Sequence, residues 1–144
     1  MADDLQRRTI GLRISGRSFK ALLIHAAEGL FDLITDSKAI KRLQRDQRRS
    51  SSTKVRLKLK AENAAELFLQ WLREWLFLFS TKKVIPVQYR FDKLTQKELT
   101  ASAKCEIFNP RVHEQRYEVK AITYHAFKIH RSAKGWSADV IVDV

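Results

Sequence analysis

The residues best suited to chemistry lie at the end of the chain. Asp143 precedes the last residue, Val144. The side-chain carboxylate of Asp143 therefore lies next to the α-carboxylate of Val144. Carboxylate and carbonyl oxygens are hard ligands that suit Ca²⁺, Mg²⁺ or Mn²⁺. Holding such an ion requires a further acidic ligand from elsewhere in the chain. Without that ligand, a frayed terminus is the simpler interpretation.

A second polar stretch, residues 108–125, mixes aromatic, cationic and acidic side chains. Its charged and imidazole residues are Arg111, His113, Glu118, Lys120 and His125. The alternation after Glu118 predicts a strand over 118–130, which places Glu118 and Lys120 on one face and His125 on the other. Such a face is either solvated or part of a binding surface.

No enzyme motif is complete in this sequence. Gly11 to Ser18 resembles a phosphate-binding loop, but its alternating apolar residues predict a strand, a turn and a helix. The histidines lack zinc-site spacing, and no serine, threonine or cysteine lies in a nucleophile motif. Cys105 lies in an alternating apolar series, as is typical of a buried thiol. We therefore assign no catalytic residue and expect no enzymatic activity.

The chain is strongly basic. It has 28 Lys and Arg against 16 Asp and Glu, a net charge of +12, which favours RNA, DNA or an acidic protein as partner. Half of that charge lies in residues 37–54, which predicts a basic loop there, either mobile or in contact with RNA or an acidic partner. The loop cations expected to make such contacts are Lys41, Arg42, Arg45, Arg48 and Arg49.

Length and composition indicate one domain in a reducing compartment. The 144 residues fit a single domain, and a single cysteine predicts no intrachain disulfide. The sequence contains neither an apolar signal core nor an apolar run long enough to span a membrane. We expect a cytoplasmic protein without a membrane partner. Whether residues 1–8 are ordered is left open.

The elements that must position the polar residues follow from hydrophobic periodicity. The expected elements are strands over 9–15 and 55–60, helices over 18–34 and 63–80, a hairpin over 84–107, and strands over 118–130 and 136–144. This order predicts an α+β fold, a two-layer α/β sandwich with two helices on a mostly antiparallel or mixed sheet. Residues 76–79 are apolar all round, which indicates burial on every side or a patch for a partner.

Taken in order, several segments resemble the archease family. They are residues 10–16, 30–36, 71–79, 108–113, 118–125 and 135–144, and together they cover nearly the whole chain from Thr9 onward. The most specific are the string Glu118-Val119-Lys120-Ala121-Ile122-Thr123-Tyr124-His125 and the chain end Asp143-Val144. The resemblance implies an archease-like two-layer fold with a small strand subdomain.

The resemblance also implies a function. Archeases are protein cofactors of the GTP-dependent RNA-splicing (tRNA) ligase, and they promote its guanylylation and repeated turnover in tRNA splicing and RNA repair. On this basis Glu118, Lys120, His125, His113 and Arg111 are expected to lie near the surface that meets the ligase. The alternative is a basic RNA-binding module with no role in activating a ligase, since charge alone accounts for RNA binding.

The family resemblance further implies a divalent cation, commonly calcium. Its ligands would be an N-terminal Asp, Asp143 and Val144. In this chain Thr9 occupies the position of the N-terminal Asp, and two arginines precede it. A neutral hydroxyl in place of a carboxylate lowers the affinity expected for a hard cation.

Overall fold

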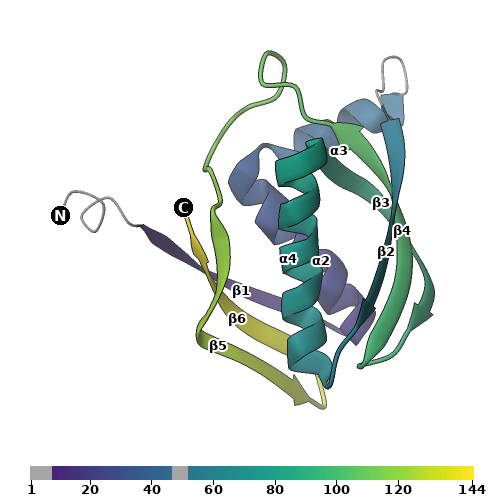
Figure 1. The fold of residues 1–144 in the computed structure, drawn as a ribbon, viewed down its shortest axis with the longest axis vertical. Helices are drawn as coiled ribbons and strands as arrows, with labels where there is room; N and C mark the ends of the chain where they lie inside the picture. Colours follow the sequence, from purple (N-terminus) through teal and green to yellow (C-terminus); the bar gives the residue numbers. More distant parts are fainter. Residues whose placement is uncertain (1–7, 47–51) are drawn as a thin grey trace.

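The computed structural model describes residues 8–46 and 52–144, and it consists of three helices and six strands in that part of the chain. The chain order is β1 (Thr9–Gly16), α2 (Phe19–Ile34), α3 (Ser37–Asp46), β2 (Ser52–Lys60), α4 (Ala64–Lys82), β3 (Val84–Leu94), β4 (Glu98–Ile107), β5 (Ala121–Ser132) and β6 (Gly135–Asp143). Figure 1 shows the long helices α2 and α4 crossing the middle of the molecule.

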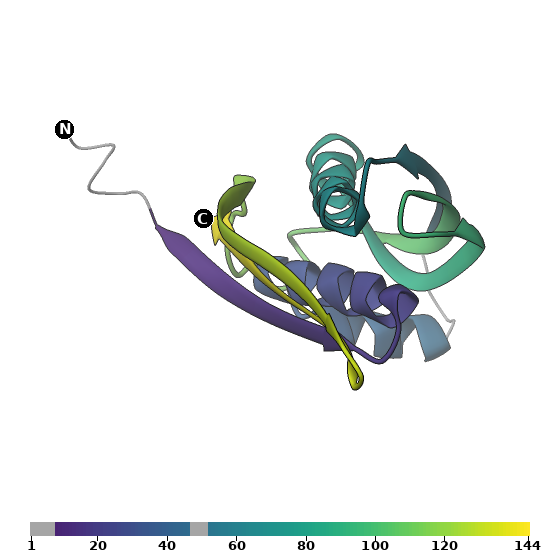
Figure 2. The ribbon, with the colours of Figure 1, turned by 90° about the horizontal axis from the view of Figure 1, so that it is seen from below.

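The strands form two separate sheets, and all of their pairings are antiparallel. One sheet has the order β1-β6-β5 and is called here the terminal sheet, while the other has the order β2-β4-β3 and is called the hairpin sheet. Helices α2 and α4 lie between the two sheets (Figure 2). Because each sheet turns its apolar face toward these helices, a single core forms between the layers.

Local signals explain both long helices. Ser18 caps α2 by accepting a hydrogen bond from Ala21 N at 3.0 Å, and Asn63 caps α4 by accepting one from Glu66 N at 2.9 Å. In the core, the indole of Trp71 is fully buried and donates a hydrogen bond to Leu23 O at 2.7 Å. This bond joins α4 to α2.

Most of the predicted architecture is confirmed. The α+β class, the strand-turn-helix over residues 9–34, the cap at Asn63 and the hairpin after Val84 all occur. Two details differ from the prediction of two helices on one sheet. The structure has a third helix, and its strands divide equally between two sheets. In addition, no described helix is long and apolar enough to cross a membrane.

The predicted basic loop over residues 37–54 is wrong in its described parts. Residues 37–46 form α3, and residues 52–54 belong to β2. The helix forms because Asp36 Oδ1 accepts a hydrogen bond from Ala39 N at 3.1 Å and because Ile40, 2% exposed, packs into the core. Residues 47–51, which include Arg48 and Arg49, lie outside the described residues, as do residues 1–7.

The apolar turn at residues 76–79 is buried only in part. Leu78 is 7% exposed, whereas Phe77 is 59% exposed. At 3.6 residues per turn, Phe77 lies on the opposite side of α4 from Trp75, which is buried in the core, and about a quarter turn away from Leu78. Of the two alternatives for this turn, burial on every side is therefore wrong for Phe77, and a patch for a partner stays a prediction.

Candidate functional site

The predicted site at the chain end lies on one row of the terminal sheet. Thr9 of β1 pairs with Asp143 of β6, and Asp143 pairs on its other side with Ala121 of β5. Directly paired residues project from the same face of a sheet. This row therefore brings Thr9 and Asp143 together on the face that turns away from the helices.

Backbone hydrogen bonds fix both sides of the chain end. Val144 N donates to Arg8 O at 3.0 Å, and Lys120 N donates to Asp143 O at 2.7 Å. The expectation of a frayed terminus is wrong, because β6 is the central strand and is hydrogen-bonded to the chain on both sides. Lys120 is consequently held next to Asp143 and Val144 at the end of the sheet.

The segment that carries Glu118 and Lys120 is not part of β5. The predicted strand over 118–130 begins only at Ala121. Before that point the backbone is bonded to the end of α2 instead, since Arg116 N donates to Ile34 O at 3.0 Å and Tyr117 N donates to Leu33 O at 2.9 Å. The amides of Arg116 and Tyr117 are therefore used by α2, and the segment rejoins β6 only at Lys120, whose N donates to Asp143 O.

Arg116 anchors this segment through its side chain. Its Nη1 lies 3.1 Å from Asp32 O and 3.3 Å from Asp32 Oδ1, and its Nε lies 3.1 Å from Glu114 Oε1. The hydrogen bond that Arg116 donates to Glu114 and the negative charges of Glu114, Asp32 and Asp36 raise the pKa of Arg116. The sequence analysis missed this anchor, because Arg116 and Asp32 are 84 positions apart and no spacing rule links them.

His125 lies on a wide bulge in β5. The register passes from Thr123 opposite Ile141 to Lys128 opposite Asp139, so residues 124–127 all lie across from Val140 alone. Within the bulge Ala126 has a φ of 54°, which lies in the left-handed region. The predicted alternation of faces ends at Thr123, and both Tyr124 and His125 are exposed.

Contacts from α4 hold the bulge in one conformation. The guanidinium carbon of Arg73 lies 4.1 Å from the centre of the Tyr124 ring, and Arg73 Nη2 donates to Ile122 O at 3.1 Å. On the inner side, the Phe127 ring stacks on Phe68 with centroids 5.7 Å apart. His125 is therefore presented to solvent by a fixed backbone rather than by an open loop.

Arg111 and His113 lie in a separate turn. Asn109 organises this turn, since its Oδ1 accepts from Arg111 N at 3.0 Å while its own N donates to His113 Nδ1 at 2.9 Å. Figure 1 shows the chain passing from this turn at the top of the view down to β5 and the C-terminus. The structure thus groups Lys120 with the chain end but leaves Arg111 and His113 apart from it.

Of the basic residues expected to contact RNA, Lys41, Arg42 and Arg45 belong to helix α3 and not to a loop. Lys41 is half-buried and paired with Glu28, and Arg42 is exposed on α3. The backbone of Arg45 belongs to the same helix. The predicted contact surface built on these residues together with Arg48 and Arg49 stays a prediction.

Comparison with known proteins identifies the family. The model of the archease protein family matches residues 9–144. The chain belongs to the archease family. Curated archeases of similar sequence include that of Methanopyrus kandleri, 30% identical over 126 residues and covering 85% of this chain and 84% of the relative. The archease of Methanosarcina acetivorans is 27% identical over 133 residues, covering 90% of this chain and 85% of the relative.

Solved archease structures share the fold. The crystal structure of an archease and possible chaperone from Thermotoga maritima superimposes with a TM-score of 0.65 at 23% identity, covering 94% of this chain and 90% of that one. The solution structure of a Methanobacterium thermoautotrophicum protein gives the same TM-score and identity, covering 96% of this chain and 98% of that one. These matches support the arrangement of helices on antiparallel sheets.

The residues at the chain end of this archease do not supply the full ligand set that the family resemblance implies. Asp143 and Val144 are present, but Thr9, opposite Asp143, offers only a neutral hydroxyl. Among the described residues, no three His, Cys, Asp or Glu side chains gather as a metal site. A hard cation needs several anionic oxygens. The residues at the chain end therefore do not fit the divalent cation that the resemblance implies.

Proposed function

We propose that this chain is a protein cofactor that activates a GTP-dependent RNA-splicing (tRNA) ligase. In this proposal it makes no covalent bond itself, and it promotes guanylylation of the ligase and multiple turnover in tRNA splicing and RNA repair. The observation that carries the proposal is the match to the archease family over residues 9–144. The ordered chain end supports it by offering a fixed surface for a protein partner.

The surface proposed to meet the ligase consists of Glu118, Lys120, His125 and Asp143. Lys120 lies on backbone held by its hydrogen bond to Asp143 O, His125 lies on the anchored bulge, and Asp143 lies on the central strand β6. Glu118 lies two residues before Lys120. A preformed surface loses little conformational entropy on binding. To activate the ligase, it must bind the guanylylation-competent conformation more tightly than the resting one.

The test measures guanylylation and multiple-turnover joining of a 3′-phosphate RNA by the cognate ligase. The reactions contain no addition, the wild-type chain, Asp143→Ala, or Asp139→Ala as a matched control. Asp139 lies on the same strand and the same face as Asp143, but it is four residues away and paired with Arg13. We expect wild type and Asp139→Ala to raise turnover, and Asp143→Ala to lose most of the gain.

Equal turnover with and without the wild-type chain would overturn the proposal. A gain that both Asp variants retain in full would instead refute the placement of the ligase surface at the chain end. Circular dichroism of each variant checks that the fold is intact, which is expected because Asp139 and Asp143 are on the solvent side of the sheet.

A further inference from the structure

The outer face of the hairpin sheet carries a dense row of cations. Along β2, Lys54, Arg56, Lys58 and Lys60 are exposed while the intervening Val55 and Leu57 are buried. Alternate residues of a strand lie on one face and repeat about every 6.6 Å. The four cations therefore form one line on the side away from the helices.

The neighbouring strands add further positive charge to this face. Lys104 of β4 lies directly opposite Lys54, and Arg90 of β3 lies in the same row as Arg56, across Ser102. Like charges that face each other across a strand pair destabilise a sheet. The folded chain does not benefit from the facing pair Lys54 and Lys104, but a bound anion would relieve their repulsion.

Few of these cations are neutralised within the protein. Arg90 pairs with Asp92 at 3.2 Å, and Lys93 pairs with Glu98. The hydrogen bond from Lys93 and the positive charges of Lys93, Lys60 and Lys58 lower the pKa of Glu98, so the field of the row reaches this carboxyl. Five cations of this face form no ion pair with any described residue. They are Lys54, Arg56, Lys58, Lys60 and Lys104.

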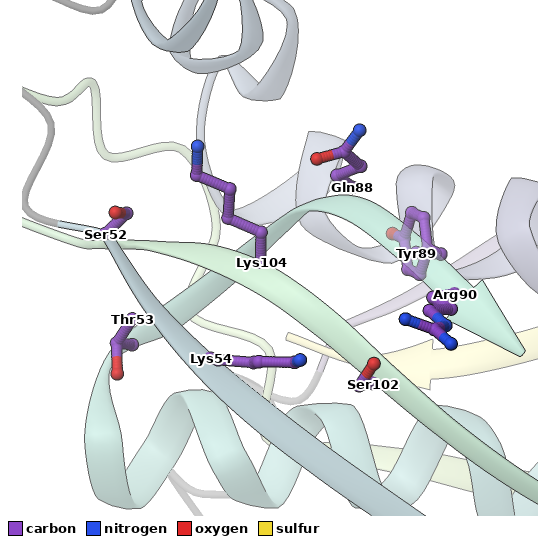
Figure 3. Close-up of a pocket in the computed structure, with 8 residues that line it drawn as sticks. All are labelled: Ser52, Thr53, Lys54, Gln88, Tyr89, Arg90, Ser102 and Lys104. Carbon is purple, nitrogen blue, oxygen red and sulfur yellow. The ribbon is translucent and has the colours of Figure 1, made fainter. Parts of the chain in front are cut away.

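A hollow of about 570 Å³ lies at one end of this face. Its lining includes Lys54, Lys104 and Arg90, together with the hydroxyl of Ser102 and the amide of Gln88. Figure 3 shows Lys54 extending along the strands toward Ser102, while Lys104 and Gln88 extend from the two neighbouring strands. Ammonium, guanidinium, hydroxyl and amide donors together suit the oxygens of a phosphate group.

The chemistry of this face favours nucleic acid over protein. A stable protein interface needs apolar or aromatic anchors at its centre. The side chains that β2 and β4 direct outward at residues 54–60 and 98–104 are cationic, acidic or hydroxylic, and none is aromatic or aliphatic. Without exposed rings for base stacking, the contact must be with the backbone.

We propose that the outer face of the hairpin sheet, built on Lys54, Arg56, Lys58 and Lys104, binds the phosphodiester backbone of a nucleic acid. The row of cations follows the phosphates of one strand, and the hollow holds one phosphate. Binding is independent of sequence. It is also separate from the chain end, so it does not depend on the proposed ligase partner.

The test is fluorescence anisotropy with labelled single-stranded RNA and DNA of the same sequence, without ligase, over a series of salt concentrations. Four to five phosphate contacts predict a slope of log K against log salt of about −3. The variant Lys54→Gln/Lys58→Gln/Lys104→Gln loses three phosphate contacts, so its slope should be shallower by about 2, which is about −1. The matched control Lys82→Gln/Lys128→Gln/Lys134→Gln removes the same charge from exposed positions elsewhere and should keep the wild-type slope.

Four results would overturn the proposal. The first is unchanged binding by the hairpin-sheet variant, and the second is an equal loss in both triple variants, which would indicate net charge alone. The third is binding of polyglutamate as tight as binding of RNA, which would indicate an acidic protein partner. Comparable affinity for RNA and DNA supports backbone recognition, whereas a preference above about tenfold for one sugar contradicts it. The unfolding midpoint of the variant should equal or exceed that of wild type, because facing like charges are removed.

Discussion

Arg73 of α4 lies with its guanidinium carbon 4.1 Å from the ring centre of Tyr124, on the bulge of β5. The same side chain donates to Ile122 O at 3.1 Å, just before the bulge. One residue thus joins the helix layer to the edge strand of the terminal sheet at two points. The exposed residue His125 is kept in place by this connection.

Replacing Arg73 should loosen the bulge. We expect Arg73→Ala to lower the free energy of unfolding by about 1–2 kcal/mol, since a cation–π contact and a charged hydrogen bond are lost together. Urea denaturation measures the change. A double-mutant cycle with Tyr124→Ala should give a coupling energy of about 0.5–1 kcal/mol. A coupling energy of zero would show that the ring and the guanidinium do not interact in solution.

Restoring an acid at position 9 should create a tighter cation site. Thr9 lies opposite Asp143, so Thr9→Asp adds a carboxylate to the same row. We expect isothermal titration calorimetry to show weak Ca²⁺ binding by wild type and binding at least about tenfold tighter by Thr9→Asp, because Ca²⁺ affinity rises with the number of charged ligands. Thr9→Asn, which adds the same shape without the charge, is the control. Equal affinity of all three chains would exclude this row as a cation site.

Cys105 should make stability depend on pH in the alkaline range. Burial raises the pKa of its thiol to about 12. The thiol of the unfolded chain ionises at a pKa of about 8.5. The stabilisation that comes from burying the neutral thiol is therefore fully present below that pH, and it is lost as pH rises toward the pKa of the folded state. Between those limits, wild type should lose about 1.4 kcal/mol per pH unit relative to Cys105→Ala. Parallel stability curves for the two chains would refute this.

Two aromatic residues of α4 should differ sharply in their effect on stability. Trp71 is fully buried and hydrogen-bonded to Leu23 O, whereas Phe77 is 59% exposed. We expect Trp71→Ala to cost about 3–5 kcal/mol and Phe77→Ala less than about 1 kcal/mol. Chemical denaturation of both variants checks this. Similar costs would mean that Phe77 is covered in solution.

The features that sequence predicted well are local ones. Ser18, Asn63 and the alternation of Ile10, Leu12 and Ile14 each act within a few residues of the element that they define. Because such signals need no distant partner, they indicated the first strand, both long helices and the hairpin. The buried thiol of Cys105 followed from the same alternation.

The features that sequence missed depend on distant partners. Helix α3 looked like a charged loop because its composition is basic, and the burial of Ile40 that helps to offset this composition depends on core residues far along the chain. The cap at Asp36 is a local signal that the sequence analysis overlooked. The anchor between Arg116 and Asp32, and the bulge between Thr123 and Lys128, arise from contacts across the fold. At the chain end, the structure pairs Thr9 with Asp143, as the predicted site requires. The sequence alone already showed that position 9 holds a threonine and not an acidic residue.

The pairing of the first strand with the last has a consequence for biosynthesis. Strand β1 leaves the ribosome early, yet its partner β6 is made more than a hundred residues later. Until then the apolar side chains of β1 have no sheet to join, and the edges of the strand are unpaired. The strands of the hairpin sheet lie closer together along the chain, so fewer residues must be synthesised before this sheet can form. The nascent chain is therefore expected to complete the terminal sheet last, and β1 is the segment that needs protection from aggregation during translation.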